Sequence, residues 1–381
     1  MRELSVRSDQ WTVRSGTLLR MKIILATGIY PPDIGGPATY VSHLAATLWG
    51  NGEDVTVITY AKRHVPVEKS PWKVTTVSKW GGPLLRWWRF SQKLRAEGAN
   101  ADIVYAFSPM SVGMPLFLAR LKKPKKILRF GGDFLWERYT DWHGRKSLHQ
   151  WYASFPRLSV LLGFLFRRFD VLVFSTRFQA QLYHRFYGRL PKHVVIENAL
   201  PEGESVLHTH HEPFRLLFMG RFVRFKNLRS LLFAVADLPH VTLTLMGEGP
   251  VARELSALSE KLHLKGRLVF LPPTRGAEKE KVLREHDLLI IPSITEISPH
   301  VALEARAIGL PVLLTVETGL SEGLHAGMFL SPLKTVEDIT RAILDAEHRY
   351  EEVAAEAASP FQKRGWEAIA EETNVLFRSL L

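Results

Sequence analysis

Short apolar runs alternate with amphipathic stretches along most of the chain, and this alternation is the strongest constraint on its fold. Met21–Thr27 is apolar and leads into a loop rich in glycine and proline. A helical pattern follows, in which the apolar residues from Tyr40 to Leu48 recur at three- and four-residue spacing. Val55–Thr59 is the next apolar run. A strand, a loop, a helix and a second strand in this order predict the beginning of a doubly wound parallel sheet.

The same alternation begins again in the second half of the chain. Residues 201–212 are polar and without pattern, which predicts a linker, and a new series of strands and helices starts at Arg215–Met219. We therefore predict an α/β protein with two Rossmann-like parallel-sheet domains, residues 21–200 and 213–359. The carboxyl ends of the strands of both domains would line a cleft between them.

The two ends of the chain fall outside the predicted domains. Residues 1–20 lack the apolar core and the small-residue cleavage site of a secretory signal, so we expect an N-terminal extension. Pro360–Leu381 has the pattern of a long amphipathic helix. The longest apolar run, Leu158–Phe166, is about half as long as the roughly 18 residues that a membrane-crossing helix needs.

The charge of the chain is unevenly divided between its halves. Residues 1–200 hold 30 Lys and Arg against 13 Asp and Glu, whereas the remaining residues hold 20 against 25. A basic first half predicts that this half faces an anionic partner, such as nucleic acid, phospholipid head groups or a phosphorylated substrate. The chain has no cysteine, which excludes a disulfide scaffold, a thiolate metal site and a cysteine nucleophile.

The strongest candidate site follows the predicted buried strand Leu288–Pro292. Ser298 suits the N-cap of a helix and Pro299 its first position, and the free N–H groups of such a helix bind phosphate. Glu304 lies about five residues into this helix, roughly 7–8 Å along its axis, which is about the distance from the phosphates of a nucleotide to its ribose. Glu296, in the loop, would face the group beyond the phosphates. A solvated surface position for Glu304 is the alternative.

Two further loops carry residues that suit a diphosphate. Arg221 and Lys226 follow the first strand of the second domain, and both could bind a diphosphate, the arginine bidentately. An ordinary surface loop rich in basic residues is the alternative. Gly35 and Gly36 begin the first helix and would let the backbone approach a ligand closely, although such a pair also forms tight turns.

Taken together, these residues resemble the retaining GT-B glycosyltransferases of glycosyltransferase family 4. The matching stretches are PPDIGG, NGEDVTVIT, VVIENAL, MGRFVRFKNL, the E-x(7)-E pair of Glu296 and Glu304, and FQKRGWEAIAEET. The resemblance spans about Met21 to Leu381. It implies GT-B architecture, in which the second domain binds a nucleotide-sugar, the first binds the acceptor, and the helix at 360–381 crosses back onto the first domain.

The resemblance also implies a role for each candidate residue. Arg221 and Lys226 would hold the diphosphate and supply the positive charge without a metal ion or other cofactor. Glu304 would bind the ribose and Glu296 the donor sugar. Because Pro299 has no amide hydrogen, the hydrogen bonds to the donor after Glu296 would come from His300, Val301 or the Ser298 hydroxyl. The backbone at Gly35 and Gly36 would contact the donor as well.

The implied reaction is transfer of a sugar from a nucleoside diphosphate to an acceptor hydroxyl with retention of configuration. The sequence offers no clear nucleophile for a double displacement, so we favour a front-side route. The family commonly places a histidine of the first domain near the reacting carbon, whereas here Gly131-Gly132-Asp133 follows the strand Lys126–Arg129. Asp133 is the candidate for acceptor positioning or proton removal, and an Asx turn is the alternative.

An aromatic and basic segment suits a membrane surface, because tryptophan and cationic side chains favour the head-group layer. An ordinary packed helix with a basic outer face is the alternative. With the charge asymmetry, this segment predicts a glycan or polyprenyl-linked acceptor and a peripheral location on the cytoplasmic face of the plasma membrane. The residues of this predicted surface are Arg86, Trp87, Trp88, Arg89 and Lys93.

Two other function classes compete with this interpretation. The basic charge alone would suit a nucleic-acid-binding protein, but no recognised nucleic-acid motif is present, so we expect no such partner. A sugar-nucleotide epimerase or a non-catalytic relative with the same fold is the second alternative, because fold alone does not determine chemistry.

Overall fold

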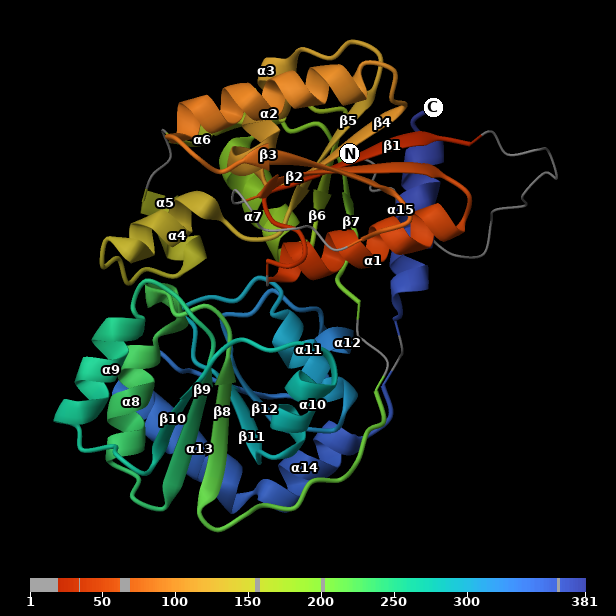
Figure 1. The fold of residues 1–381 in the computed structure, drawn as a ribbon. Helices are drawn as coiled ribbons and strands as arrows, with labels where there is room; N and C mark the ends of the chain where they lie inside the picture. Colours follow the sequence, from red (N-terminus) through yellow and green to blue (C-terminus); the bar gives the residue numbers. More distant parts are fainter. Residues whose placement is uncertain (1–19, 34, 62–68, 155–157, 200–202, 362–363) are drawn as a thin grey trace.

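The computed structural model describes residues 20–33, 35–61, 69–154, 158–199, 203–361 and 364–381. It contains two entirely parallel sheets with helices packed on both faces of each (Figure 1). The strand order is β3-β2-β1-β4-β5-β6-β7 in the first sheet and β10-β9-β8-β11-β12-β13 in the second. The predicted α/β fold with two Rossmann-like parallel sheets is confirmed. Apart from Arg20, the predicted N-terminal extension lies outside the described residues.

The inner strands of the first sheet are largely buried because helices cover both of its faces, whereas the edge strands β3 and β7 are more exposed. They are β1 (Lys22–Thr27), β2 (Asp54–Ala61), β3 (Lys73–Ser78), β4 (Ile103–Phe107), β5 (Lys125–Phe130), β6 (Val171–Phe174) and β7 (Lys192–Val195). The helical segments around them are α1 (Gly36–Gly50), α2 (Pro83–Gly98), the π-helical turn η1 (Pro109–Gly113), α3 (Met114–Ala119), α4 (Phe134–Asp141), α5 (Leu148–Ser154), α6 (Leu158–Phe166) and α7 (Arg177–Tyr187).

The second sheet is built in the same way. Its strands are β8 (Phe214–Met219), β9 (Val241–Met246), β10 (Leu268–Leu271), β11 (Leu288–Ile291), β12 (Val312–Thr315) and β13 (Phe329–Ser331). Its helical segments are the 3₁₀ turn η2 (Arg224–Lys226), α8 (Leu228–Ala236), α9 (Ala252–Lys261), α10 (Gly276–Arg284), α11 (His300–Ala307), α12 (Glu322–His325), α13 (Val336–His348) and α14 (Tyr350–Ala358). Among the described residues, none of the helices combines the length and apolar character needed to span a bilayer.

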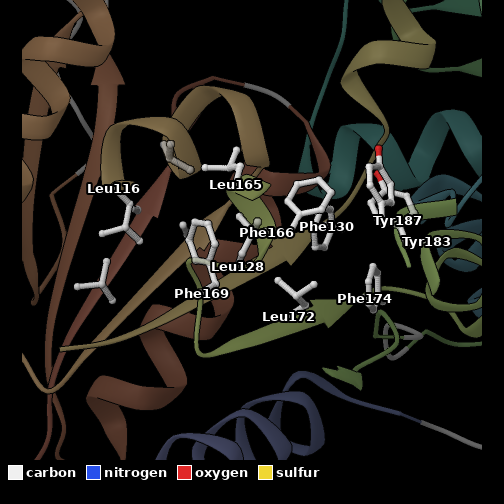
Figure 2. Close-up of a cluster of buried hydrophobic side chains, with 14 of the residues drawn as sticks. Leu116, Leu128, Phe130, Leu165, Phe166, Phe169, Leu172, Phe174, Tyr183 and Tyr187 are labelled. Atoms are coloured by element: carbon white, nitrogen blue, oxygen red, sulfur yellow. The ribbon is translucent and has the colours of Figure 1, made fainter. Parts of the chain in front are cut away.

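Strand β5 shows how the core fixes the loops that face the second domain. Phe130 points into the aromatic cluster of Figure 2, where its ring stacks on Phe174 at 5.0 Å and meets Phe166 edge-on at 5.1 Å. Arg129, the preceding residue, belongs to the opposite face of the sheet and lies over the ring of Tyr40 of α1. The end of β5 is therefore clamped on both faces, which holds the following loop in place.

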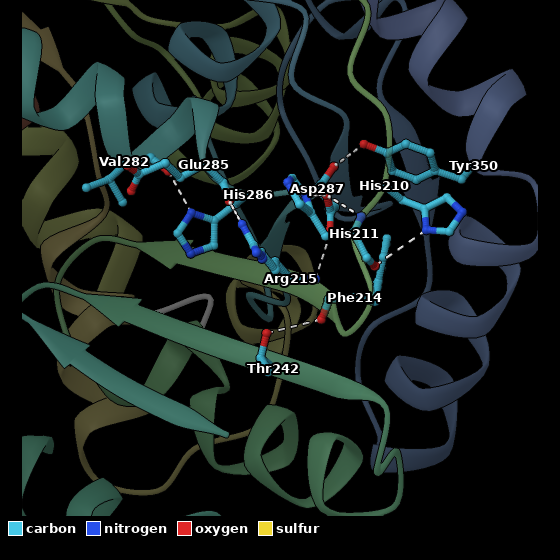
Figure 3. A network of polar contacts seen from close by, with 10 residues as sticks. All are labelled: His210, His211, Phe214, Arg215, Thr242, Val282, Glu285, His286, Asp287 and Tyr350. Carbon is cyan, nitrogen blue, oxygen red and sulfur yellow. Dashed lines mark hydrogen bonds and ion pairs between the residues drawn. The ribbon is translucent and has the colours of Figure 1, made fainter. Parts of the chain in front are cut away.

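The stretch predicted as a linker packs against the second domain over its described residues. Asp287 is fully buried, and its carboxylate accepts hydrogen bonds from the backbone N–H and Nδ1 of His211 at 3.2 and 2.7 Å (Figure 3). The same carboxylate accepts from the Arg215 N–H at 2.7 Å, and the Asp287 carbonyl accepts from the Tyr350 hydroxyl at 3.0 Å. Asp287 thus ties this stretch to β8 and α14. Residues 201 and 202 lie outside the described residues.

The last helix, α15 (Trp366–Arg378), returns to the first sheet, beside α1 (Figure 1). It begins at Trp366, later than the predicted start at Pro360. Its Trp366 ring stacks on His43 of α1 at 4.6 Å, and Arg378 forms an ion pair with Glu53, which is 2% exposed. Glu53 also accepts a hydrogen bond from the Met21 N–H at 2.6 Å, so one buried carboxylate joins α15 to the first strand.

We predict that Glu53→Gln destabilises the protein by about 1.5–3 kcal/mol, because a hydrogen bond between charged groups contributes about that much when it is buried. The control is Lys73→Gln, which removes a more exposed ion pair with Glu97 and should change stability by less than about 1 kcal/mol. Denaturant unfolding of the three proteins measures both changes. Equal stability of the Glu53→Gln variant and the wild type would contradict the role assigned to Glu53.

Candidate active site

The loops that follow the strands of the two sheets meet between the domains. Trp136 of α4 packs against Phe225 of η2, with ring centroids 5.2 Å apart. The Leu148 N–H donates to the Thr295 hydroxyl at 3.1 Å, and the Asn198 side-chain amide donates to the Ser298 hydroxyl. Each of these contacts joins the first domain to the second. The carboxyl ends of parallel strands are where open α/β sheets place their ligand sites.

Lys226 and Glu296, both candidates from the sequence, form an ion pair. Their side chains are 14% and 8% exposed, and the Glu296 carboxylate also accepts from the Ser293 hydroxyl at 2.6 Å. Asn227 follows in the left-handed conformation with φ 55°, which turns the chain sharply between η2 and α8. This turn lets Lys226 point toward the loop after β11. A buried pair of this kind is held together because neither charge is solvated well alone.

Arg221 forms an ion pair with Glu137 across the two domains, with Nη2 and Oε2 3.0 Å apart. Arg221 is 60% exposed, whereas Glu137, in the first turns of α4, is 25% exposed. Burial raises the pKa of the Glu137 carboxyl, and Asp133 raises it further, against the lowering effects of Arg221 and Lys226. The sequence analysis missed Glu137, although it lies one helical turn beyond the loop that was singled out.

Glu304 pairs with a lysine that the sequence analysis also missed. Lys279 of α10 forms an ion pair with Glu304 of α11, and their side chains are 25% and 32% exposed. Glu304 is therefore only partly solvated and has a charged partner. The described structure gives each of the four charged candidates, Arg221, Lys226, Glu296 and Glu304, an opposite charge.

Helices α1 and α11 begin face to face. Helix α11 starts at His300, with Pro299 at the N-cap position. Ser298, which the sequence predicted as the N-cap, instead accepts a hydrogen bond from the Asn198 side chain. The His300 ring lies against the start of α1, where a Cβ added at Gly36 would be 3.0 Å from His300 Cδ2. The amino-terminal ends of both helices carry partial positive charge, so their convergence favours an anion.

The His300 imidazole lies in a positively charged environment. Burial lowers its pKa to about 4, and the nearby charges of Arg129 and Lys279 lower it as well, so the ring is neutral at pH 7. Arg129 is 4% exposed and donates to the Ile196 carbonyl at 3.0 Å and to the Asn198 side chain at 3.1 Å. Its position between the apolar residues Leu128 and Phe130 of β5 was the sequence signal for this residue, and it was missed.

Asp133 does not occupy the place that the sequence suggested. Its carboxylate is 3% exposed and accepts from the Trp136 N–H at 2.9 Å, capping α4. The hydroxyls of Tyr152 and Tyr183 donate to it at 2.5 and 2.8 Å. These donors satisfy the carboxylate inside the first domain, so the geometry agrees with the alternative of a capping turn. The structure therefore favours the capping role of Asp133 over acceptor positioning or proton removal.

The aromatic and basic segment forms the loop before α2, which carries Trp80, and the exposed beginning of that helix. Trp80 and Trp88 are 73% and 56% exposed, and the Arg89 guanidinium lies 5.5 Å from the centroid of the Trp80 ring. Phe90 and Leu94 are buried and fix the helix to the domain. Of the other predicted surface residues, Arg86 is exposed, whereas Trp87 and Lys93 are half-buried.

In the part of the chain that the structure describes, no three His, Asp or Glu side chains come together in a way that would hold a metal ion.

Family models match both halves of the chain. Residues 35–199 match the glycosyl transferase 4-like domain, and residues 204–359 match glycosyl transferases group 1. A glycosyltransferase of Methanocaldococcus jannaschii is 26% identical, with 93% of this chain and 97% of the relative covered. The D-inositol 3-phosphate glycosyltransferase of Corynebacterium jeikeium is 31% identical, over 44% of this chain and 45% of the relative.

Solved structures share the fold over nearly the whole chain. Sucrose-phosphate synthase from Thermosynechococcus elongatus superposes with a TM-score of 0.78 at 20% identity, covering 95% of this chain and 99% of that one. Anabaena HepE, solved with UDP and glucose, gives a TM-score of 0.70 at 18% identity, covering 94% and 100%. With both halves matched by family models and the two-sheet architecture in place, the chain belongs to the group 1 glycosyl transferases and is a GT-B glycosyltransferase of the family 4 type.

Proposed function

We propose that this glycosyltransferase moves a sugar, with retention, from a nucleoside diphosphate to a hydroxyl of a glycan or lipid-linked acceptor. The observation that carries the proposal is the meeting of Arg221, Lys226 and Glu296 at the interdomain contact. The Anabaena relative solved with UDP and glucose supports a nucleotide-sugar as the donor.

In this proposal the donor diphosphate replaces the carboxylates that now pair with the cations. Arg221 and Lys226 exchange Glu137 and Glu296 for phosphate oxygens, which accept strong charge-assisted hydrogen bonds. These two side chains then stabilise the negative charge that develops on the diphosphate as the sugar leaves, with no need for a metal ion or other cofactor. Loss of one such group costs about 3 kcal/mol of transition-state stabilisation by analogy with an oxyanion-hole donor.

The remaining donor contacts follow from the two facing helix ends. The first-turn amides of α11, from His300 and Val301, bind phosphate together with the Ser298 hydroxyl, and the backbone at Gly35 and Gly36 approaches from α1. Released from Lys226, Glu296 binds the donor sugar, and Glu304 accepts hydrogen bonds from the ribose hydroxyls.

We further propose that the exposed start of α2 rests on an anionic membrane surface at the cytoplasmic face. Trp80 and Trp88 would insert among the head groups, and Arg86 and Arg89 would pair with lipid phosphates. A lipid-linked acceptor would then reach the first domain from the membrane.

We predict that a UDP-, GDP- or ADP-sugar raises the unfolding temperature of the protein, and that Arg221→Ala and Glu304→Ala each reduce this shift. Loss of a hydrogen bond to a charged group costs about 1.5–3 kcal/mol, which is about a tenfold to hundredfold loss of donor affinity. A thermal-shift titration with each nucleotide-sugar measures the effect.

The matched control for this titration is Arg224→Ala. Arg224 lies in the same loop as Arg221 but pairs with Glu254 within the second domain, so its removal should leave donor affinity unchanged. If no nucleotide-sugar shifts the wild type, or if Arg224→Ala weakens binding as much as Arg221→Ala, the proposed donor site is wrong.

The low pKa of His300 predicts a dependence of stability on pH. An unfolded histidine takes up a proton near pH 6.5, whereas folded His300 does so near pH 4, so stability falls as the pH falls through this interval. We expect a loss of about 2 kcal/mol between pH 7 and pH 5 that His300→Gln abolishes. Denaturant unfolding at several pH values measures it, with His348→Gln, at an exposed position of α13, as control. Parallel curves for the wild type and His300→Gln would refute the assignment.

For the membrane surface, we predict that the protein sediments with anionic liposomes at low salt and less so at high salt, because salt screens surface charge. Replacing Trp80 and Trp88 together by Ala should reduce the bound fraction severalfold. Trp142→Ala is the control, because Trp142 is an 82% exposed tryptophan on the C-terminal side of α4. Equal binding to neutral and anionic liposomes, or none to either, would contradict the proposed surface.

A further inference from the structure

We propose that Glu137 is the first-domain carboxylate that receives the proton of the acceptor hydroxyl. This inference rests on the proposed function, since it assigns a residue to the transfer step itself. Neither the motifs of the sequence nor the E-x(7)-E pair pointed to Glu137.

The position of Glu137 relative to the diphosphate cations is the first reason. Its carboxylate lies 3.0 Å from the Arg221 guanidinium, and Lys226 also acts on its charge. In a front-side reaction the acceptor oxygen enters on the face that the diphosphate leaves, so the acceptor must lie beside the diphosphate. A group that takes its proton must therefore reach the diphosphate cations from the acceptor-binding domain. Within the described parts of the chain, Glu137 is a first-domain carboxylate that does so.

The rigidity of its support is the second reason. Helix α4 is capped by Asp133, and the neighbouring Trp136 is anchored by Phe225 and by a hydrogen bond from its Nε1 to the Lys146 carbonyl at 3.0 Å. Glu137 therefore stands on a helix that is fixed to both domains. Catalytic groups need such preorganised positions, because small displacements cost large factors in rate.

Gly132 is the third element of the arrangement. A Cβ added at Gly132 would lie 2.5 Å from Glu137 Oε1, so the carboxylate rests directly above the glycine backbone. Any larger residue at this position would push the carboxylate away. The glycine therefore makes room for the side chain of Glu137, in addition to any role in the turn.

The charges around Glu137 act on the proton affinity of its carboxylate. The groups that act on it are Arg221 and Lys226 from the second domain and Asp133 from its own. Burial already raises the pKa of the carboxyl, and a bound diphosphate, by drawing Arg221 away and adding negative charge nearby, would raise this pKa further. A raised pKa makes the carboxylate a stronger base for the acceptor proton.

The bond between the sugar anomeric carbon and the diphosphate oxygen breaks, and its electron pair stays on the diphosphate. The acceptor oxygen forms a bond to the same carbon and loses its proton to a Glu137 oxygen. The protonated carboxyl passes the proton to water when the products leave.

Glu137→Gln tests this role, because it keeps the shape of the side chain and removes the base. The probe is the nucleotide-sugar that gives the largest thermal shift, with water as the acceptor and release of nucleoside diphosphate as the readout. We expect release to fall about 10²- to 10⁴-fold, with donor affinity equal to or higher than that of the wild type. The matched control is Asp141→Asn on the same helix, whose carboxylate pairs with Arg138 on the surface.

The pH profile separates a base from a mere partner of Arg221. In the wild type, the rate should fall at low pH as Glu137 is protonated, and Glu137→Gln should lose this limb while Asp141→Asn keeps it. Gly132→Ala should lower the rate by displacing the carboxylate, and it should have little further effect when Glu137→Gln is already present.

Three results would overturn the inference. The first is a Glu137→Gln variant that releases nucleoside diphosphate as fast as the wild type. The second is a Glu137→Gln variant whose rate still falls at low pH as the wild-type rate does. A variant that changes only donor affinity would make Glu137 a clamp for Arg221 and not a base. If the wild type binds no nucleotide-sugar, the proposed function fails and this inference fails with it, which the binding titration distinguishes from the other outcomes.

Discussion

Pairing of opposite charges at the contact between the two domains is the interaction on which the site depends, and one of these pairs, Arg221 with Glu137, joins the two domains. Lys226 with Glu296, Lys279 with Glu304 and Arg221 with Glu137 form three ion pairs around one interdomain contact. Partly buried charges are stable only when they are compensated, so the site without a donor is held in a neutral arrangement. A diphosphate carries the charge needed to take over the cations. When a donor binds, Arg221 and Lys226 therefore exchange their carboxylate partners for phosphate oxygens, and the interdomain contact rearranges at the same time.

The fold supplies this exchange with a rigid frame. Strand β5 is held by the aromatic cluster around Phe130 on one face and by Arg129 against Tyr40 on the other. Arg129 then reaches Asn198, which binds Ser298 immediately before α11. A chain of hydrogen bonds thus runs from the first sheet to the helix whose amino-terminal end faces Gly36. Of the charged residues of the site, Glu137, Lys279 and Glu304 stand on helices that pack on this frame.

The sequence predicted the features that depend on local pattern. The alternation of strands and helices follows from periodicity, and the position of Glu296 follows from the rule that ligands bind at strand ends. The placing of Lys226 and Glu296 in one donor site came from the resemblance to family 4. The strands β3 and β13 were missed because they lie at sheet edges and lack a fully buried face. The partners of the charged residues were also missed: Glu137 and Arg221 are 84 residues apart, and Lys279 and Glu304 lie on different helices. For Asp133, the local sequence fitted both a base and a cap, and only distant Tyr152 and Tyr183 decide between them.

The most direct test of this account is the preference of the site for a diphosphate over a monophosphate. Calorimetric titration of the wild type and of Lys226→Met with UDP and UMP, and with GDP and GMP, measures this preference. We expect the wild type to bind one diphosphate at least about tenfold more tightly than its monophosphate, and Lys226→Met to lose most of this difference. Equal preference in the two proteins would show that Lys226 does not exchange its carboxylate for phosphate, and the central claim would be wrong.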